Sequence, residues 1–130
     1  LETLLIRVKN FASQHFEAKE INYKIEIEEH AKQLHLSMAY RQHIYLIMKE
    51  AINNLVKYSN CSEAEIIVNS YHSILRIIIK DNGRGFNSEI QSKGNGLLNM
   101  RKRAVEMKAT LDIISSTAKG TTISLAVKIK

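Results

Sequence analysis

The segment Asp81–Phe86 (DNGRGF) comes at the end of a mostly apolar stretch, Leu75–Ile79. A short apolar run bounded by turn residues predicts a buried strand, so Asp81 should stand at the end of that strand, on the floor of a pocket. A carboxylate there can accept a hydrogen bond from an exocyclic amine such as that of adenine. Gly83 and Gly85 would let a flat ring approach the backbone closely. Asp-Asn-Gly is also an ordinary turn former, so the segment alone is compatible with a plain tight turn.

A helical pattern runs from about Ser37 to Ser59, upstream of that strand. Ser37 is a suitable N-cap, because its hydroxyl can accept a hydrogen bond from a backbone N–H of the first turn. Glu50, Asn54 and Lys57 share one face of the helix, at positions i, i+4 and i+7. The predicted core face is a separate apolar stripe, made of Ile44, Met48, Ala51 and Leu55 and flanked by Ile52 and Val56.

The polar face of this helix suits a site for a metal-bound triphosphate. The amide oxygen of Asn54 can ligate Mg²⁺, which prefers oxygen ligands and keeps several waters. Lys57 can neutralise phosphate oxygens, and the Glu50 carboxylate can orient or deprotonate a nucleophile. Such spacing is common on helices, so a solvated polar face is the favoured explanation when this pattern is taken alone.

A second glycine-rich segment, Gly94–Arg101 (GNGLLNMR), leads into another predicted helix. A helix N-terminus preceded by glycines offers free N–H groups and a positive dipole end to an anion. The segment is not a Walker loop, because Gly-Lys-Ser/Thr is missing. Arg101 and Arg103 lie in the first turns, where cations oppose the helix dipole. A phosphate ligand would compensate for that misfit, and solvated arginines are an equally good explanation.

The remaining segments predict an α+β fold. Residues 1–18 have helical spacing, and residues 21–28 alternate as a half-buried strand. Further strands are expected near 64–71, 74–81 and 110–115 and after Lys119-Gly120, with a turn near His72-Ser73 and a helix at about 97–107. The prediction is therefore about five strands, mostly antiparallel, with helices covering one face.

Composition sets limits on function. The chain has 130 residues, enough for one domain, and a net charge of +6. Its basic residues are scattered, aromatic residues make up 6% and tryptophan is absent, which argues against nucleic acid as a partner. Cys61 is the only cysteine, which favours a reducing compartment. No apolar run is long enough to cross a membrane. We therefore expect a cytoplasmic domain of a protein that is either soluble or membrane-anchored.

In their order and spacing, these motifs resemble those of the GHKL (Bergerat-fold) ATPase superfamily. Glu50–Tyr58 resembles the N box and Asp81–Gly85 the G1 box. Gly94–Met100 resembles the G2 box, and Gly120–Thr122 the last glycine box. The resemblance runs from about residue 20 to the C-terminus. It implies a two-layer α/β sandwich with a short ATP lid, binding ATP and Mg²⁺.

The resemblance also implies a role for individual residues. Asp81 would bind the adenine amine with help from Thr121, and Asn54 would ligate Mg²⁺. Glu50 occupies the position of the general base in hydrolysing relatives, where many sensor kinases carry Asn. The expected ATP-binding residues are Asn54, Lys57, Tyr58, Asp81, Gly83, Gly85, Phe86, Gly94, Gly96, Leu97, Leu98, Arg103, Thr121 and Thr122.

Within the superfamily, Gly96–Ala104 (GLLNMRKRA) resembles the sensor histidine kinases paired with NarL-type response regulators. Such kinases carry an acceptor histidine, followed by an acidic residue, on a dimerisation domain. None of the five histidines here fits: His15, His30, His35, His43 and His72 precede Phe, Ala, Leu, Ile and Ser. The chain therefore resembles a catalytic fragment whose partners would be the missing histidine-bearing domain and a response regulator.

The expected organisation is a linker helix, or the tail of a dimerisation helix, at residues 1–18, followed by an ATP-binding catalytic domain at 19–130. The isolated domain is expected to be monomeric. Two alternatives stay open at this point. One is a serine kinase of the anti-sigma-factor type, and the other is an ATP-sensing pseudokinase module without turnover.

Overall fold

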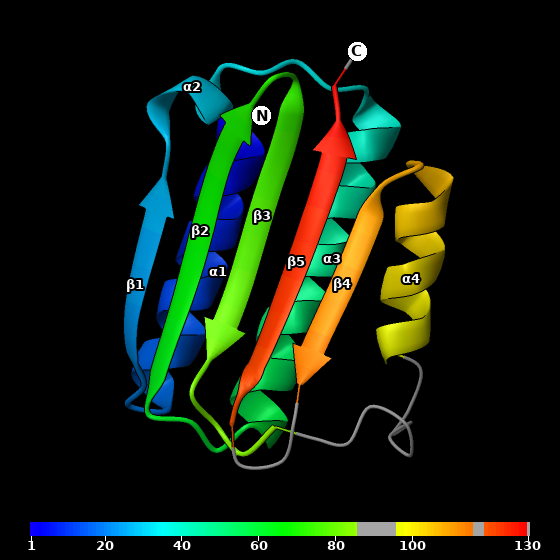
Figure 1. Ribbon diagram of the computed structural model, residues 1–130. Coiled ribbons are helices and arrows are strands. Elements are labelled where there is room, and N and C mark those ends of the chain that lie inside the picture. The colour runs from blue at the N-terminus through cyan, green and yellow to red at the C-terminus, as the bar shows by residue number, and fades with distance from the viewer. Residues whose placement is uncertain (86–95, 116–118, 130) are drawn as a thin grey trace.

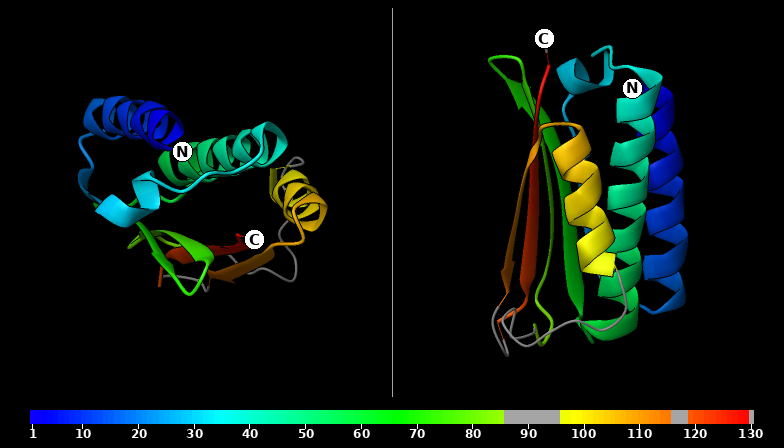
Figure 2. Two further views of the ribbon diagram at one scale, coloured as in Figure 1. Left: turned by 90° about the horizontal axis from the view of Figure 1, so that it is seen from above. Right: turned by 90° about the vertical axis from the view of Figure 1, so that its right-hand side faces the viewer.

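The computed structural model describes residues 1–85, 96–115 and 119–129. It contains two layers, a five-stranded sheet and a layer of helices that covers one of its faces (Figures 1 and 2). The elements in chain order are α1 (Glu2–Ala18), β1 (Asn22–Ile27), α2 (Glu29–Lys32), α3 (Met38–Tyr58), β2 (Glu63–Tyr71), β3 (Ile74–Asp81), α4 (Gly96–Glu106), β4 (Thr110–Ser115) and β5 (Thr121–Lys128). The α+β prediction is confirmed.

The strand order across the sheet is β1-β2-β3-β5-β4. The β1–β2 pair is parallel, and the β2–β3, β3–β5 and β4–β5 pairs are antiparallel. The sheet is thus mixed and mostly antiparallel, as predicted. A two-residue turn joins β2 to β3, with φ of 51° at His72 and 63° at Ser73. Positive φ at both turn positions matches the twist of the flanking strands.

Helix boundaries agree with the predicted ones to within one or two residues. The hydroxyl of Ser37 caps α3 by accepting a hydrogen bond from the Tyr40 N–H at 3.1 Å. The short helix α2 was not predicted, because four residues are too few for a helical period to show in the sequence. The core face of α3 is buried as expected, except that Val56 is only partly buried and Ile47, which was not predicted, is buried.

The core lies between the sheet and the helices and is continuous from α1 to β4. Along each strand, every second side chain faces the helices. Register places Ile66, Ile79, Ile123 and Ile113 side by side across β2, β3, β5 and β4 on this face. α1 contributes Leu4, Leu5, Val8, Ala12 and Phe16 to the same core. Two residues further along the strands on the same face, beyond the isoleucine row, the sheet ends in a polar row.

Candidate functional site

The polar row consists of Asp81, Thr121 and Ser115, with Ala64 beside them. The residues are direct register partners in the order Ala64, Asp81, Thr121, Ser115, on the face that the helices cover. The hydroxyls of Thr121 and Ser115 lie 2.8 Å apart, a usual O–H···O hydrogen-bond distance. The row of isoleucines lies directly behind. A ligand with a polar edge would therefore meet polar atoms at this end of the sheet.

Asp81 ends β3 and is half-buried. Burial raises the pKa of its carboxyl, and hydrogen bonds from the backbone N–H groups of Gly83 and Thr121 act in the opposite direction. The Gly83 N–H donates to Asp81 Oδ1 at 2.7 Å. These two fixed donors hold the carboxylate in place. Its remaining lone pairs can accept a hydrogen bond from a ligand amine, as predicted for this position.

Gly83 brings the loop after β3 against the C-terminal end of α3. A side-chain carbon at Gly83 would overlap the carbonyl oxygen of Ser59 and lie 2.7 Å from its Cβ. The Arg84 N–H donates to that same Ser59 oxygen at 2.8 Å, and Arg84 Nε donates to the Tyr58 carbonyl at 3.1 Å. Only a glycine allows this approach, so Gly83 fixes the distance between Asp81 and α3.

Gly120 has a comparable role on the other side of Asp81. Its φ is +83°, and a Cβ at this position would overlap the carbonyl oxygen of Asp81 and come within 3.2 Å of the Asn82 Cα. The chain entering β5 therefore packs directly on the backbone of the Asp81 turn. This contact places Thr121 next to Asp81.

The start of α4 lies against the polar face of α3. A Cβ on Gly96 would overlap the Glu50 carboxylate and lie 3.2 Å from the Asn54 side-chain nitrogen. Glu50 and Asn54 are partly buried, whereas Lys57 is exposed one turn further along the same face. Glu50, Asn54 and Gly96 were each predicted as site residues, and the structure brings them together, a contact that was not predicted. It lies at the same end of the molecule as Asp81, where β3 and α3 end and β5 and α4 begin (Figure 1).

Other predicted ATP-binding residues lie apart from this grouping. Thr122 is on the opposite face of the sheet from Asp81, beside Lys80 and Ile114. Arg103 lies seven residues, about two helical turns, beyond Gly96. Its guanidinium is 3.4 Å from His43 Nδ1.

The remaining predicted residues are placed as follows. Tyr58 and Leu98 are exposed, at 57% and 53%. Leu97 packs against the core, and Gly85 follows Arg84 with φ of 63°. Phe86 and Gly94 lie outside the described residues. Ser115 was not predicted, although the alternation of residues 110–115 would have placed it on the core face.

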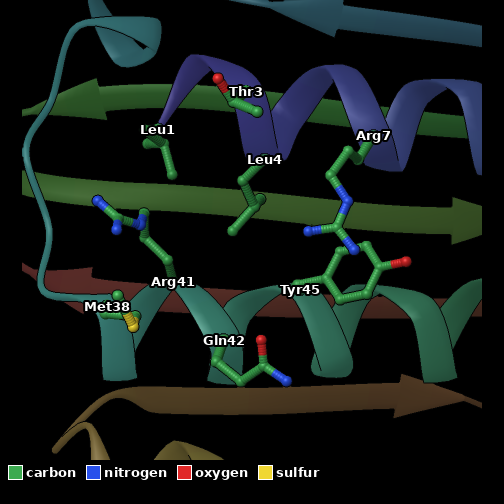
Figure 3. A pocket seen from close by; sticks show the side chains of 8 residues that line it. All are labelled: Leu1, Thr3, Leu4, Arg7, Met38, Arg41, Gln42 and Tyr45. Atoms are coloured by element: carbon green, nitrogen blue, oxygen red, sulfur yellow. The ribbon is translucent and has the colours of Figure 1, made fainter.

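The opposite end of the helix layer has a groove of about 430 Å³ between α1 and α3 (Figure 3). Its lining residues are Leu1, Thr3, Leu4, Arg7, Met38, Arg41, Gln42 and Tyr45. The Arg7 guanidinium lies over the Tyr45 ring, 4.3 Å from its centroid. Arg41 donates to the Leu36 carbonyl at 3.1 Å. None of the predicted site residues lines this groove.

Within 1–85, 96–115 and 119–129, no three His, Cys, Asp or Glu side chains cluster as a metal site would require. None of the helices in these ranges is both long and apolar enough to cross a bilayer.

Fold and site together define a nucleotide-binding α/β sandwich. The Asp81 carboxylate lies at the end of the sheet, and Gly83, Gly96 and Gly120 form the close contacts at this end of the molecule. Residues 39–130 match the family model described as "Histidine kinase-, DNA gyrase B-, and HSP90-like ATPase". The chain belongs to this family and carries its ATP-binding domain, which confirms the superfamily recognised from the motifs.

Relatives and solved structures agree with this assignment. The chain is 32% identical over 106 residues to the sensor histidine kinase LiaS of Bacillus subtilis (strain 168), covering 81% of this chain and 29% of LiaS. It is 38% identical over 84 residues to the sensor protein VraS of Staphylococcus haemolyticus (strain JCSC1435), covering 64% of this chain and 24% of VraS. The chain thus spans less than a third of the length of either relative.

The fold is also that of a solved structure, the histidine kinase domain of the blue-light-activated histidine kinase from Erythrobacter litoralis EL346. The TM-score is 0.81 at 14% identity, over 97% of this chain and 61% of that one. At this identity the likeness concerns the fold. The predicted two-layer sandwich is confirmed.

Proposed function

We propose that this chain is the catalytic domain of a sensor histidine kinase. It transfers the γ-phosphoryl group of ATP to a histidine on a separate dimerisation domain. The observation that carries the proposal is the contact of Gly96 with Glu50 and Asn54 at the same end as Asp81. It brings the residues proposed to bind the phosphates to the end of the molecule where Asp81 would bind the base. The similarity to LiaS and VraS, a sensor histidine kinase and a sensor protein, supports the choice of reaction.

In this proposal the sheet end binds the adenine. Asp81 accepts a hydrogen bond from the exocyclic amine, and Thr121 contacts the neighbouring ring edge directly or through one water. Gly85 leaves room for the ring at the backbone, and Gly83, which packs on Ser59, holds the Asp81 turn in place. Because two backbone N–H groups already hold the Asp81 carboxylate, little reorganisation is needed when the base binds.

The polar face of α3 takes the phosphates. Lys57 is exposed on the last turn and neutralises phosphate oxygens. Free N–H groups at the start of α4, near Gly96, face the same region and favour an anion. Gly94 and Phe86 are further proposed contacts, as are Tyr58, Leu97 and Leu98. Thr122, on the other face of the sheet, and Arg103, about two helical turns beyond Gly96, remain further proposed contacts.

Asn54 fits Mg²⁺ as a ligand, with the Glu50 carboxylate beside it. A single amide oxygen beside a carboxylate leaves several positions for water and phosphate oxygens, which is how Mg²⁺ is usually held with a nucleotide. When bound, Mg²⁺ would neutralise charge on the transferring phosphoryl group. Glu50 holds or accepts the proton of the attacking group, or orients that group. Its neighbour Gly96 keeps the carboxylate turned towards the start of α4.

Outside this chain, the proposal requires a histidine-bearing dimerisation domain of the same full-length protein and a response regulator of the NarL type. Residues 1–18 would form the connection to that domain, with 19–130 as the catalytic part. Nucleic acid has no role. The domain is monomeric and cytoplasmic, in a full-length protein that is either soluble or membrane-anchored.

The test mixes this domain with its cognate dimerisation domain and ATP labelled on the γ-phosphate. We expect label on the partner that is lost in acid and retained in base, as for phosphohistidine. Acid-stable label on a serine would instead support the anti-sigma-type kinase, and ATP binding with no transfer to any partner would support a pseudokinase module. Either result would contradict the proposal.

Two variants separate binding from transfer. Glu50→Gln should slow transfer on the order of 100-fold while ATP affinity stays within about threefold, because the carboxylate acts on the nucleophile. Asn54→Ala should lower ATP affinity about tenfold with Mg²⁺ present and leave it unchanged in EDTA. The matched control is Asn53→Ala, the adjacent residue on a different side of the helix, which should change neither quantity.

A further inference from the structure

A side-chain cluster joins α4 to α3 about two helical turns away from the contact of Gly96 with Glu50. His43 Nε2 lies 3.0 Å from Glu106 Oε1, and His43 Nδ1 lies 3.4 Å from an Arg103 guanidinium nitrogen. We infer that His43 is a positioning residue: it sets the position of α4 along α3, and with it the N–H groups near Gly96 that would bind phosphate. This inference rests on the proposed ATP site.

The contacts between the two helices are matched in spacing. α3 and α4 run in opposite directions (Figure 1). Gly96 meets Glu50 at one end of the contact, and Arg103 meets His43 at the other. Seven residues separate His43 from Glu50, and seven also separate Gly96 from Arg103, which is about 10 Å in an α-helix. A slide of α4 along α3 would therefore break the His43 contacts and move Gly96 away from Glu50 at the same time.

The apolar contacts of α4 do not fix its position by themselves. Its buried residues are Met100 and Ala104, and Met107 is buried just after the helix. Methionine side chains are unbranched and flexible, so they fill a core without specifying one register. Between packed helices, register is commonly specified by polar contacts that have to match. The His43 cluster supplies such contacts here.

Each partner of His43 has a single hydrogen-bonding role. A guanidinium can only donate and an ionised carboxylate can only accept, so Nδ1 accepts from Arg103 and Nε2–H donates to Glu106. The contact to Glu106 is within the usual hydrogen-bond range, and the one to Arg103 is longer and weaker. Glu106 is the last residue of α4, where a carboxylate opposes the helix dipole. The imidazole N–H compensates for that position.

The test compares the affinities for Mg·ATP and AMP by calorimetry, because AMP has the same base and lacks the β- and γ-phosphates. For His43→Ala we expect ATP affinity to fall about three- to fivefold, since α4 would occupy the binding position only part of the time. AMP affinity should stay the same, because Asp81 and Thr121 are held by β3 and β5. The matched control is Gln42→Ala, the neighbouring residue that faces the groove, which should alter neither affinity.

Two further variants test the hydrogen-bonding roles. His43→Gln keeps one acceptor for Arg103 and one donor for Glu106, so it should restore most of the ATP affinity. Glu106→Ala should lower ATP affinity as His43→Ala does. The double variant should lose no more than either single one, because both substitutions remove the same contact.

An equal loss of affinity for ATP and AMP in His43→Ala would overturn the inference and indicate a purely structural histidine. Unchanged ATP affinity in a folded His43→Ala chain would overturn it, and so would losses that multiply in the double variant. A His43→Gln chain that binds ATP no better than His43→Ala would also contradict it. The parent chain separates this inference from the proposed function. No ATP binding there would overturn both, whereas ATP binding without transfer would overturn the proposed reaction alone.

Discussion

The two ends of α3 are built differently. At its C-terminal end, which we call the Asp81 end, Gly83 and Gly96 contact α3 so closely that a single added carbon would overlap protein atoms. At its N-terminal end, the Arg7 end, long side chains line an open groove of about 430 Å³, and Met38 is 76% exposed. The Arg7 end is held by side-chain contacts such as Arg7 on Tyr45.

This difference predicts where substitutions are tolerated. The overlapping atoms at Gly83 and Gly120 are backbone atoms, which cannot move aside as the end of a flexible side chain can. Contacts between long side chains can repack at little cost. Substitutions at the Asp81 end should therefore impair both packing and ATP binding, whereas substitutions at the Arg7 end should be tolerated. Four measurements test this contrast, in order of decreasing expected effect.

The largest effect is expected for Asp81→Asn. The amide places an N–H donor where the adenine amine needs an acceptor, and removes a charged partner, so ATP affinity should fall on the order of 100-fold. Isothermal titration provides the measurement. The matched control is Asp112→Asn on the exposed outer face of β4, which should bind ATP like the parent. Equal affinities for Asp81→Asn and the parent would refute the base assignment.

The next effect concerns stability. Gly120→Ala would combine positive φ with an overlap on the Asp81 carbonyl, so the free energy of unfolding should fall by about 2 kcal/mol. Urea denaturation followed by circular dichroism would show the shift. Lys119→Ala, at the exposed neighbouring position, is the control and should stay within about 0.5 kcal/mol of the parent. A stable Gly120→Ala would mean that the contact can relax.

A smaller effect should follow pH. Burial raises the pKa of Asp81 above its ordinary value of 3.8. Between that value and the raised one, the folded chain retains a proton that the unfolded chain releases, so stability should fall as pH rises through this interval. ATP affinity should change in the opposite sense, because the ionised carboxylate is the better acceptor. Denaturation and titration across this range would measure both, and Asp81→Asn should abolish both trends.

The smallest effect is expected at the Arg7 end. Arg7→Gln removes the cation from the Tyr45 ring, which should cost about 0.5 to 1 kcal/mol of stability. ATP affinity should stay within twofold, since no predicted site residue lines the groove. A tenfold loss of ATP affinity in a folded Arg7→Gln protein would show that the two ends are coupled. It would contradict the expected difference between the Asp81 end and the Arg7 end.

Local patterns were sufficient to predict much of this molecule from sequence. The apolar residues of 75–79 and the alternation of residues 123–129 predicted two of the strands, and the Ser37 cap predicted the start of α3. The position of Asp81 at a strand end follows from the same local pattern.

What sequence did not predict depends on contacts between distant segments. The register of β4 against β5 decides that Ser115 faces Thr121, and a slip of one residue would turn Ser115 to the outer face. The meeting of Gly96 with Glu50 depends on how α4 docks on α3, and the same docking brings Arg103 to His43. Helical spacing alone gives a side chain's face but not its partner.

The two-residue turn at His72-Ser73 has a consequence for how the chain folds. Closing a short loop costs less conformational entropy than closing a long one, and β2 and β3 need only this turn to pair. The parallel β1–β2 pair instead needs α2 and α3 to be in place between its strands. The strand that ends in Asp81 thus belongs to the pairing with the lowest entropic barrier, and it provides an early edge on which β5 can align Thr121.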